Sequence, residues 1–204
     1  EVIRLNQEME DNWERHLHVP NCTILREDER EPFGLCEFPN GTGQYKMLAM
    51  GNSYTANLGR FIVELFKNNY STLHTEAIPS CEALINTTAD NCGKTKYQNK
   101  FEGDIERFKP DIIFVLQRWI AAEAPLTTNV SSDPIYGQIL ESVERYSKAV
   151  KKVFILQAIP RYHCPFNCLK DAVKSNKVID PTLKECLTTD GSPMRTRIAE
   201  ACSV

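Results

Sequence analysis

Three continuous apolar runs constrain the fold of this chain more than any other feature of its sequence. They cover residues Lys46–Met50, Asp111–Gln117 and Lys152–Ala158. Uninterrupted apolar runs of this length, rather than alternating ones, are typical of strands buried on both faces of a parallel sheet. A further strand is expected at Thr72–Ile78, where Pro79 ends the run.

Amphipathic segments separate these runs. In Thr55–Asn68 apolar residues recur at helical spacing, which predicts a helix with five residues facing inward: Leu58, Phe61, Ile62, Leu65 and Phe66. Pro134–Val150 shows the same spacing, with an inward set of Ile135, Ile139, Leu140, Val143, Tyr146 and Val150. Shorter helices are expected at Glu102–Phe108 and from Met194 to Ala201. The alternation predicts an α/β fold, a three-layer α/β/α sandwich around a parallel sheet of about five strands in the flavodoxin-like order 2-1-3-4.

The first 45 residues lack this pattern. After a short helix expected at Glu1–His18 they are polar, and the charged run Arg26–Glu31 is expected to form a solvated loop. We therefore divide the chain into an irregular, disulfide-bearing segment, residues 1–45, and an α/β domain, residues 46–204. Because another strand usually follows the last helix of such a fold, we expect the domain to be truncated at its C-terminus.

Composition excludes several classes of protein. The chain has 204 residues with 24 basic and 27 acidic side chains, a net charge of −3, which argues against nucleic-acid binding. Apolar content of 42% and charged content of 25% are those of a folded globular domain. No run approaches the roughly 18 apolar residues of a membrane span. The chain does not open with Met or a signal segment, so we expect a processed product or a piece of a longer protein.

Cysteines and glycosylation motifs indicate the compartment. The chain has eight cysteines, and five N-x-S/T motifs begin at Asn21, Asn40, Asn69, Asn86 and Asn129. Together they predict an extracellular or lumenal protein with disulfides. We expect the pairs Cys22–Cys36 and Cys81–Cys92, and further bonds among Cys164, Cys168, Cys186 and Cys202. The alternatives are buried free thiols or a zinc site. Zinc is disfavoured because His163, Cys164 and Cys168 have no matching second pair of ligands.

The first apolar run leads into a turn that can carry chemistry. It reads Gly-Asn-Ser-Tyr-Thr over residues 51–55. Ser53 is expected at the N-terminus of the next helix, where free N–H groups and the helix dipole stabilise an oxyanion. The alternative is that Ser53 only caps this helix, because serine is a preferred N-cap residue. The turn is neither a phosphate-binding P-loop nor a Gly-x-Ser-x-Gly elbow.

Residues 47–58, Met-Leu-Ala-Met-Gly-Asn-Ser-Tyr-Thr-Ala-Asn-Leu, resemble the first motif block of the SGNH hydrolases, the GDSL-like esterases. With Arg118-Trp119 and the cysteine pattern, the chain is most similar to the SGNH domain at the C-terminus of nematode-type acyltransferase-3 membrane proteins, over about residues 15–204. The resemblance implies an extracytoplasmic SGNH fold that transfers or cleaves O-acyl esters, acetyl esters in the first place. Ser53 would be the nucleophile and Asn52 would orient the turn. It implies no metal or organic cofactor, an acyl-ester or carbohydrate-like substrate, and an acyl-donating membrane domain in the same chain.

The chain departs from this family pattern at three places. Ser80 replaces the glycine that offers an N–H to the oxyanion, and Gln117 or Arg118 replaces an asparagine. No Asp-x-x-His, the block that supplies the general base, occurs in the chain; the histidines are His16, His18, His74 and His163. Either this block lies beyond Val204 or the chain is an inactive relative. The competing hypothesis is therefore a non-catalytic extracellular binding module.

Overall fold

A computed structural model describes most of the α/β region. The described residues are 4, 7, 8, 11, 21–26, 29, 32–85, 92, 98–121, 124–127, 129–158, 161–162, 187–188 and 192–203. Several predictions fall outside these ranges: most of the helix at Glu1–His18, of which only residues 4, 7, 8 and 11 are described, all helical, the acceptor Asn86, and the roles of His16, His18, His163, Cys164, Cys168 and Cys186.

The main sheet has six strands in the order β1-β2-β4-β3-β5-β6. Its parallel strands are β3 (Tyr45–Gly51), β4 (Tyr70–Ala77), β5 (Ile112–Val115) and β6 (Lys152–Ile155). In chain order these four strands are arranged 2-1-3-4, which confirms the predicted flavodoxin-like order. A separate two-stranded pair joins β7 (Arg161–Tyr162) to β8 (Leu187–Thr188).

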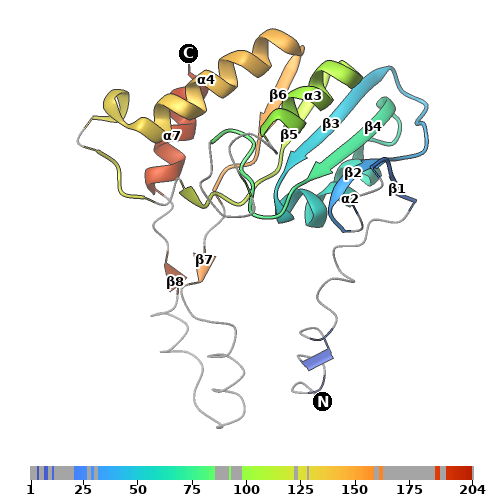
Figure 1. Cartoon of the computed structure of the whole chain (residues 1–204), viewed down its shortest axis with the longest axis horizontal. Helices are drawn as coiled ribbons and strands as arrows, with labels where there is room; N and C mark the ends of the chain where they lie inside the picture. The colour runs from blue at the N-terminus through green and yellow to red at the C-terminus, as the bar shows by residue number, and fades with distance from the viewer. Residues whose placement is uncertain are drawn as a thin grey trace.

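Helices cover both faces of the sheet, which confirms the three-layer α/β/α sandwich (Figure 1). Successive residues of a strand point to opposite faces, so β3 contributes Leu48 and Met50 to one core and Met47 and Ala49 to the other. The first core packs against α3 (Gln98–Phe108), α4 (Pro134–Ala149) and α7 (Ser192–Cys202), and the second against α2 (Ser53–Phe66). A short 3-10 helix, η3 (Val130–Ser132), precedes α4.

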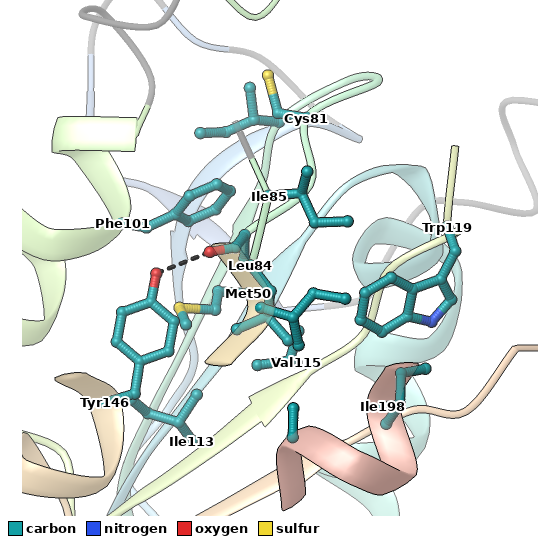
Figure 2. Packing of buried hydrophobic residues seen from close by; sticks show 14 of the residues in the cluster. Met50, Cys81, Leu84, Ile85, Phe101, Ile113, Val115, Trp119, Tyr146 and Ile198 are labelled. Atoms are coloured by element: carbon teal, nitrogen blue, oxygen red, sulfur yellow. Dashed lines mark hydrogen bonds between the residues drawn. The ribbon is translucent and has the colours of Figure 1, made fainter. Parts of the chain in front are cut away.

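The core beneath α3 and α4 also contains the segment that follows β4. Figure 2 shows Leu84 and Ile85 of this segment among residues of the sheet and the helices. In the same view the hydroxyl of Tyr146 donates a 2.8 Å hydrogen bond to the Ala83 carbonyl oxygen. Burial raises the pKa of this phenol above its ordinary value, so it remains a donor. The Tyr146 hydroxyl of α4 therefore fixes the segment after β4 against the core.

The face that α2 turns to the sheet differs from the predicted one. Its buried residues are Thr55, Ala56, Gly59 and Ile62. The prediction placed Phe61 and Leu65 inward, and this is wrong, because they are 40% and 73% exposed. Small side chains let the helix approach the sheet closely, and the larger residues then lie on its flank.

Two short antiparallel strands extend the sheet within residues 1–45. β2 (Gly34–Glu37) pairs with β4, and β1 (Thr23–Ile24) pairs with β2. The sequence analysis expected no strand here, because two and four residues are too few to show a pattern. The expected solvated loop is also wrong for Arg26 and Glu29, whose side chains are only 20% and 10% exposed.

Both predicted short-range disulfides are present, Cys22–Cys36 and Cys81–Cys92. The first ties β1 to β2, and the second fixes the buried segment after β4. Cys202 is a free, exposed thiol at the end of α7, which differs from its expected disulfide. None of the helices in the described part of the chain is long and apolar enough to cross a membrane.

Candidate active site

The turn after β3 brings Ser53 to the carboxyl edge of the sheet. Gly51 has φ +147°, a conformation that other residues rarely adopt. A Cβ there would lie 2.5 Å from the carbonyl oxygen of Leu116, at the end of β5. Glycine therefore lets β3 and β5 stay close while the chain turns. Ser53 follows as the first residue of α2 and is half-buried.

Asn52, not Ser53, is the N-cap of α2. Its Oδ1 accepts a 3.3 Å hydrogen bond from the Tyr54 N–H, as a capping side chain does. The same amide reaches the loop after β5: Oδ1 accepts from the Arg118 N–H and Nδ2 donates to the Arg118 carbonyl, both at 2.8 Å. The alternative that Ser53 serves as the cap is therefore wrong. Within the described residues the Ser53 hydroxyl has no hydrogen-bond partner.

Ser80 takes the backbone conformation that a glycine would favour. Its φ is +59°, and the Cys81 N–H donates a 3.1 Å hydrogen bond to the Ile78 carbonyl. With Pro79 at the second position and a positive φ at the third, this is a type II turn. The position thus keeps the geometry of a glycine, with a serine side chain added.

Residues 81–85, directly after this turn, are all buried. The Ala83 N–H in this segment donates to Oε1 of Gln117 at 2.6 Å. Gln117 is fully buried, and its Nε2 has no hydrogen-bond partner among the described residues. Arg118 is half-buried, and its Nε likewise has no described partner. The two predicted residues after β5 therefore differ: Gln117 lies inside the protein, and Arg118 lies at its edge.

Glu82 and Thr55 also hold the site together, and the sequence analysis singled out neither. The Glu82 carboxylate accepts the N–H groups of Ile120 and Ala121, at 2.8 and 2.9 Å. The Thr55 hydroxyl donates to the Leu116 carbonyl at 2.7 Å. A glutamate within an otherwise apolar buried stretch was the available signal for Glu82. The threonine offers none, because its partner is 61 positions away.

His74 is not the general base of this site. It pairs with Leu48 in the sheet, three residues before the pair Gly51–Ala77, so it lies about 10 Å below the carboxyl edge. Its ring stacks on Phe108 at 3.8 Å, and its Nε2 lies 3.3 Å from Oε1 of Glu37. Burial lowers the pKa of His74. It is therefore a neutral packing residue.

The described residues contain no group of three or more histidine, cysteine, aspartate or glutamate side chains that could hold a metal ion. At the carboxyl edge they offer the Ser53 hydroxyl, the Ser80 side chain, and the N–H groups at the start of α2 and in the Ser80 turn. The Gln117 amide, whose Nε2 has no described partner, lies buried next to the Ala83 N–H. The N–H groups are hydrogen-bond donors, and they lie at the same edge of the sheet as a serine hydroxyl, a side chain that can act as a nucleophile.

A family model for SGNH domains fused to AT3 domains matches residues 21–202. The chain belongs to this family. No curated protein matches it. Among solved structures, the periplasmic domain of the lipopolysaccharide acetyltransferase of Salmonella ser. Paratyphi A is similar, with 11% identity and a TM-score of 0.59. The similarity covers 100% of this chain and 76% of that one. At this identity it shows a shared fold.

The turns after β3 and β4 and the loop after β5 meet at one edge because these three strands are parallel. They hold the positions that the resemblance assigned to the nucleophile block and the two oxyanion blocks. The two disulfides are typical of an extracytoplasmic domain.

Proposed function

We propose that this SGNH domain transfers or hydrolyses O-acyl esters, most simply acetyl esters, through an acyl-enzyme on Ser53. The observation that carries the proposal is that Asn52, and not Ser53, makes the structural hydrogen bonds of the turn after β3. Asn52 caps the helix and binds the loop after β5, so the Ser53 hydroxyl has no structural task among the described residues. It is half-buried at a helix N-terminus, where a negative charge is stabilised.

In the proposed reaction, Oγ of Ser53 attacks the acyl carbonyl carbon while its proton passes to a general base. The tetrahedral oxyanion collapses, the C–O bond to the leaving alcohol breaks, and that alcohol takes the proton. Water then attacks the acyl-enzyme and releases the acid, or an acceptor alcohol attacks and receives the acyl group. Esterase and transferase therefore share the intermediate and differ in the second nucleophile.

Three donors support the oxyanion in this proposal. They are the N–H of Ser53, the N–H of Ser80 and Nε2 of Gln117. In a type II turn the N–H of the third residue is not used by the turn itself, which leaves the Ser80 N–H available. The Gln117 amide is oriented by the Ala83 N–H on its oxygen, so its NH₂ group is fixed without a described acceptor. Arg118, at the edge of the site, is proposed to contact the acceptor alcohol or the leaving alcohol.

The chain lacks the Asp-x-x-His block that would supply the general base. Fast Ser53-dependent hydrolysis would instead assign the base to one of its own histidines, and His163 would be the first to mutate. A serine without a base retains only residual catalysis, typically several orders of magnitude below an intact triad. We therefore expect the 204-residue chain to hydrolyse an activated acetyl ester slowly.

Hydrolysis of 4-nitrophenyl acetate by the wild type and by Ser53→Ala tests the proposal. Weak hydrolysis that disappears in Ser53→Ala and persists in the control Ser71→Ala supports it. Ser71 is a suitable control because its hydroxyl donates to the Tyr45 carbonyl, at the opposite end of β3. Equal rates in the wild type and Ser53→Ala would refute the acyl-enzyme.

A binding module for carbohydrate-like ligands is the second candidate. The observation that favours it is the position of His74, which removes the only described histidine from the site. Binding of an acetylated oligosaccharide that survives Ser53→Ala, without any hydrolysis in the wild type, would favour this candidate over the enzyme.

We further propose that the domain works outside the cytoplasm, attached to an acyl-donating membrane domain. The four described acceptor asparagines, Asn21, Asn40, Asn69 and Asn129, are exposed, as glycosylation requires. After secretion from a eukaryotic cell, glycosidase treatment should lower the mass of the protein; an unchanged mass would contradict this compartment.

A further inference from the structure

A cluster of buried charges lies on the α3 side of β4, apart from the candidate active site. Arg26, in the loop between β1 and β2, donates through Nη1 to Glu76 of β4 at 2.6 Å and to Glu29 of its own loop at 3.0 Å. Its Nη2 donates to both carboxylate oxygens of Asp104 in α3, at 2.7 and 2.9 Å. Lys100 of α3 completes the cluster with a 2.6 Å bond to Glu29. A single guanidinium thus binds three carboxyl groups.

The charges in this cluster do not balance if every carboxyl group is ionised. Three carboxylates would face two cations, and the side chains of Glu76 and Asp104 are only 0% and 3% exposed. An unbalanced charge at such burial is costly, and a group in this position takes up a proton instead.

Among the three carboxyl groups of the cluster, Glu76 is the one whose surroundings favour the protonated form. Arg26 binds its Oε2, whereas Oε1 is buried and has no hydrogen-bond donor. Burial, the charge of Asp104 and a hydrogen bond with Asp104 raise the pKa of Glu76 to about 9, although Arg26 lowers it. Two carboxyl groups can hydrogen-bond to each other only when one of them is protonated.

Glu29 behaves in the opposite way. Burial raises its pKa, but hydrogen bonds from Lys100, from the Leu35 N–H and from Arg26 outweigh this and lower it. Its Oε2 accepts the Leu35 N–H at 2.7 Å, at the start of β2. Glu29 is thus an ionised carboxylate that ties the loop to the sheet.

We propose that Glu76 and Asp104 share one proton beneath Arg26, and that this proton keeps Arg26 and Glu29, in the loop after β1, bound to the end of β4. With the proton, two carboxylates face two cations and the cluster is neutral. When the proton leaves for solvent, a net negative charge remains buried between β4 and α3. This binding then weakens, and the end of β4 that leads into the Ser80 turn loses its outer support.

The sign of the pH dependence follows from these charges. Unfolded Glu76 releases its proton near 4.5, whereas the folded carboxyl keeps it up to about 9. Between these values the folded state binds more protons than the unfolded one, so stability falls as pH rises. Other charged groups on this side of β4 are His74 with Glu37 and Arg107. Burial lowers the pKa of His74, so it is neutral in the upper part of this range.

Denaturant unfolding of the disulfide-intact 204-residue chain between about pH 7 and about pH 9 tests the proposal. The folding equilibrium constant of the wild type should fall by up to about tenfold per pH unit. Glu76→Gln, a neutral isostere, should lose most of this slope and be more stable than the wild type, by a margin that grows with pH. Glu102→Gln, the matched control, removes a carboxylate of α3 that pairs with Arg145 outside the cluster, and it should leave the slope in place.

An infrared spectrum gives a second readout that does not require the variant to fold. At neutral pH the wild type should show the C=O stretch of a protonated buried carboxyl group, and this band should vanish on titration through about 9. A slope equal in the wild type and Glu76→Gln, or the absence of this band, would overturn the proposal.

Discussion

Two turns at the carboxyl edge of the sheet make the same conformational demand and meet it with different residues. The turn after β3 has glycine at its positive-φ position, Gly51, and the turn after β4 has a serine, Ser80. At Gly51 a Cβ would collide with the backbone of Leu116, so both space and conformation require glycine. At Ser80 the structure holds a side chain, so only conformation opposes it. A positive φ alone tolerates serine at a cost of about 1 kcal/mol.

The two turns also hold the loop after β5 in complementary ways. Asn52, in the first, binds the N–H and the carbonyl of Arg118. Glu82, beyond the second, binds the N–H groups of Ile120 and Ala121. The Asn52 and Glu82 side chains bind different peptide groups, so the loop that carries Gln117 and Arg118 is held at two separate points. The loop after β5 is thus held by side-chain hydrogen bonds to its backbone from both turns rather than by regular secondary structure.

The largest effect is expected for Gly51→Ala. The new methyl group would lie 2.5 Å from the Leu116 carbonyl oxygen in a strained conformation, so β3 and β5 must separate. We expect a loss of at least about 3 kcal/mol in the free energy of unfolding. Urea unfolding measures it, and a loss below about 1 kcal/mol would show that Gly51 meets only a conformational demand, as Ser80 does.

Asn52→Ala should cost about 2–3 kcal/mol, because it removes the helix cap and leaves the buried backbone groups of Arg118 without partners. Asn52→Asp keeps the cap and the acceptor but places a carboxylate oxygen against the Arg118 carbonyl. It should therefore be destabilising too, with helix content retained. If Asn52→Asp is as stable as the wild type, the bond between the turn and the loop after β5 contributes little.

Glu82→Gln tests how much the segment after the second turn contributes to holding the loop after β5. One of the two N–H groups it serves would face an NH₂ group instead of an oxygen, at a cost of about 2 kcal/mol. Because Asn52 and Glu82 bind different peptide groups of one loop, a double variant should show coupling. Equilibrium unfolding of both single variants and the double variant measures this, and strictly additive losses would indicate that the two side chains act independently.

Much of the fold is encoded in local patterns, and much of the site is not. The apolar runs and the strand–helix alternation predicted the parallel strands and their order, because burial on both faces leaves a continuous apolar signature. The inward face of α2 was predicted wrongly, since periodicity gives weight to Phe61 and Leu65, whereas Gly59 and Ala56 set the packing distance. Strands β1 and β2 are too short to show a pattern.

The site was predictable where a turn implies chemistry and unpredictable where partners are distant in sequence. The nucleophile role of Ser53 stays a prediction from the resemblance of residues 47–58 to the SGNH block, whereas its position at the start of α2 follows from its own turn. The bond between Asn52 and Arg118 spans 66 positions, and that between Glu82 and Ile120 spans 38. No local pattern marks such pairs. Arg26 was expected in a solvated loop for the same reason, since its carboxylate partners in β4 and α3 lie 50 and 78 positions away.

Substitutions of Ser80 should give the smallest effects, and Ser80→Gly should increase stability. Glycine relieves the positive φ but adds freedom to the unfolded chain, so we expect a stabilisation of about 0.5–1 kcal/mol. Ser80→Ala keeps the strain and should stay within about 0.5 kcal/mol of the wild type. Thermal unfolding distinguishes them. A loss of stability in Ser80→Gly would mean that the serine hydroxyl, rather than the backbone, is what this turn requires.

The central claim, that Ser53 is held as a nucleophile while Asn52 performs the structural work, is tested most directly by covalent labelling. The 204-residue chain is incubated with a fluorophosphonate, and the modified residue is identified by peptide mass spectrometry. We predict slow formation of one adduct, on Ser53, that is absent from Ser53→Ala and unchanged in Ser71→Ala. Labelling that is equal in the wild type and Ser53→Ala, or no adduct on Ser53 at any reagent concentration, would contradict it.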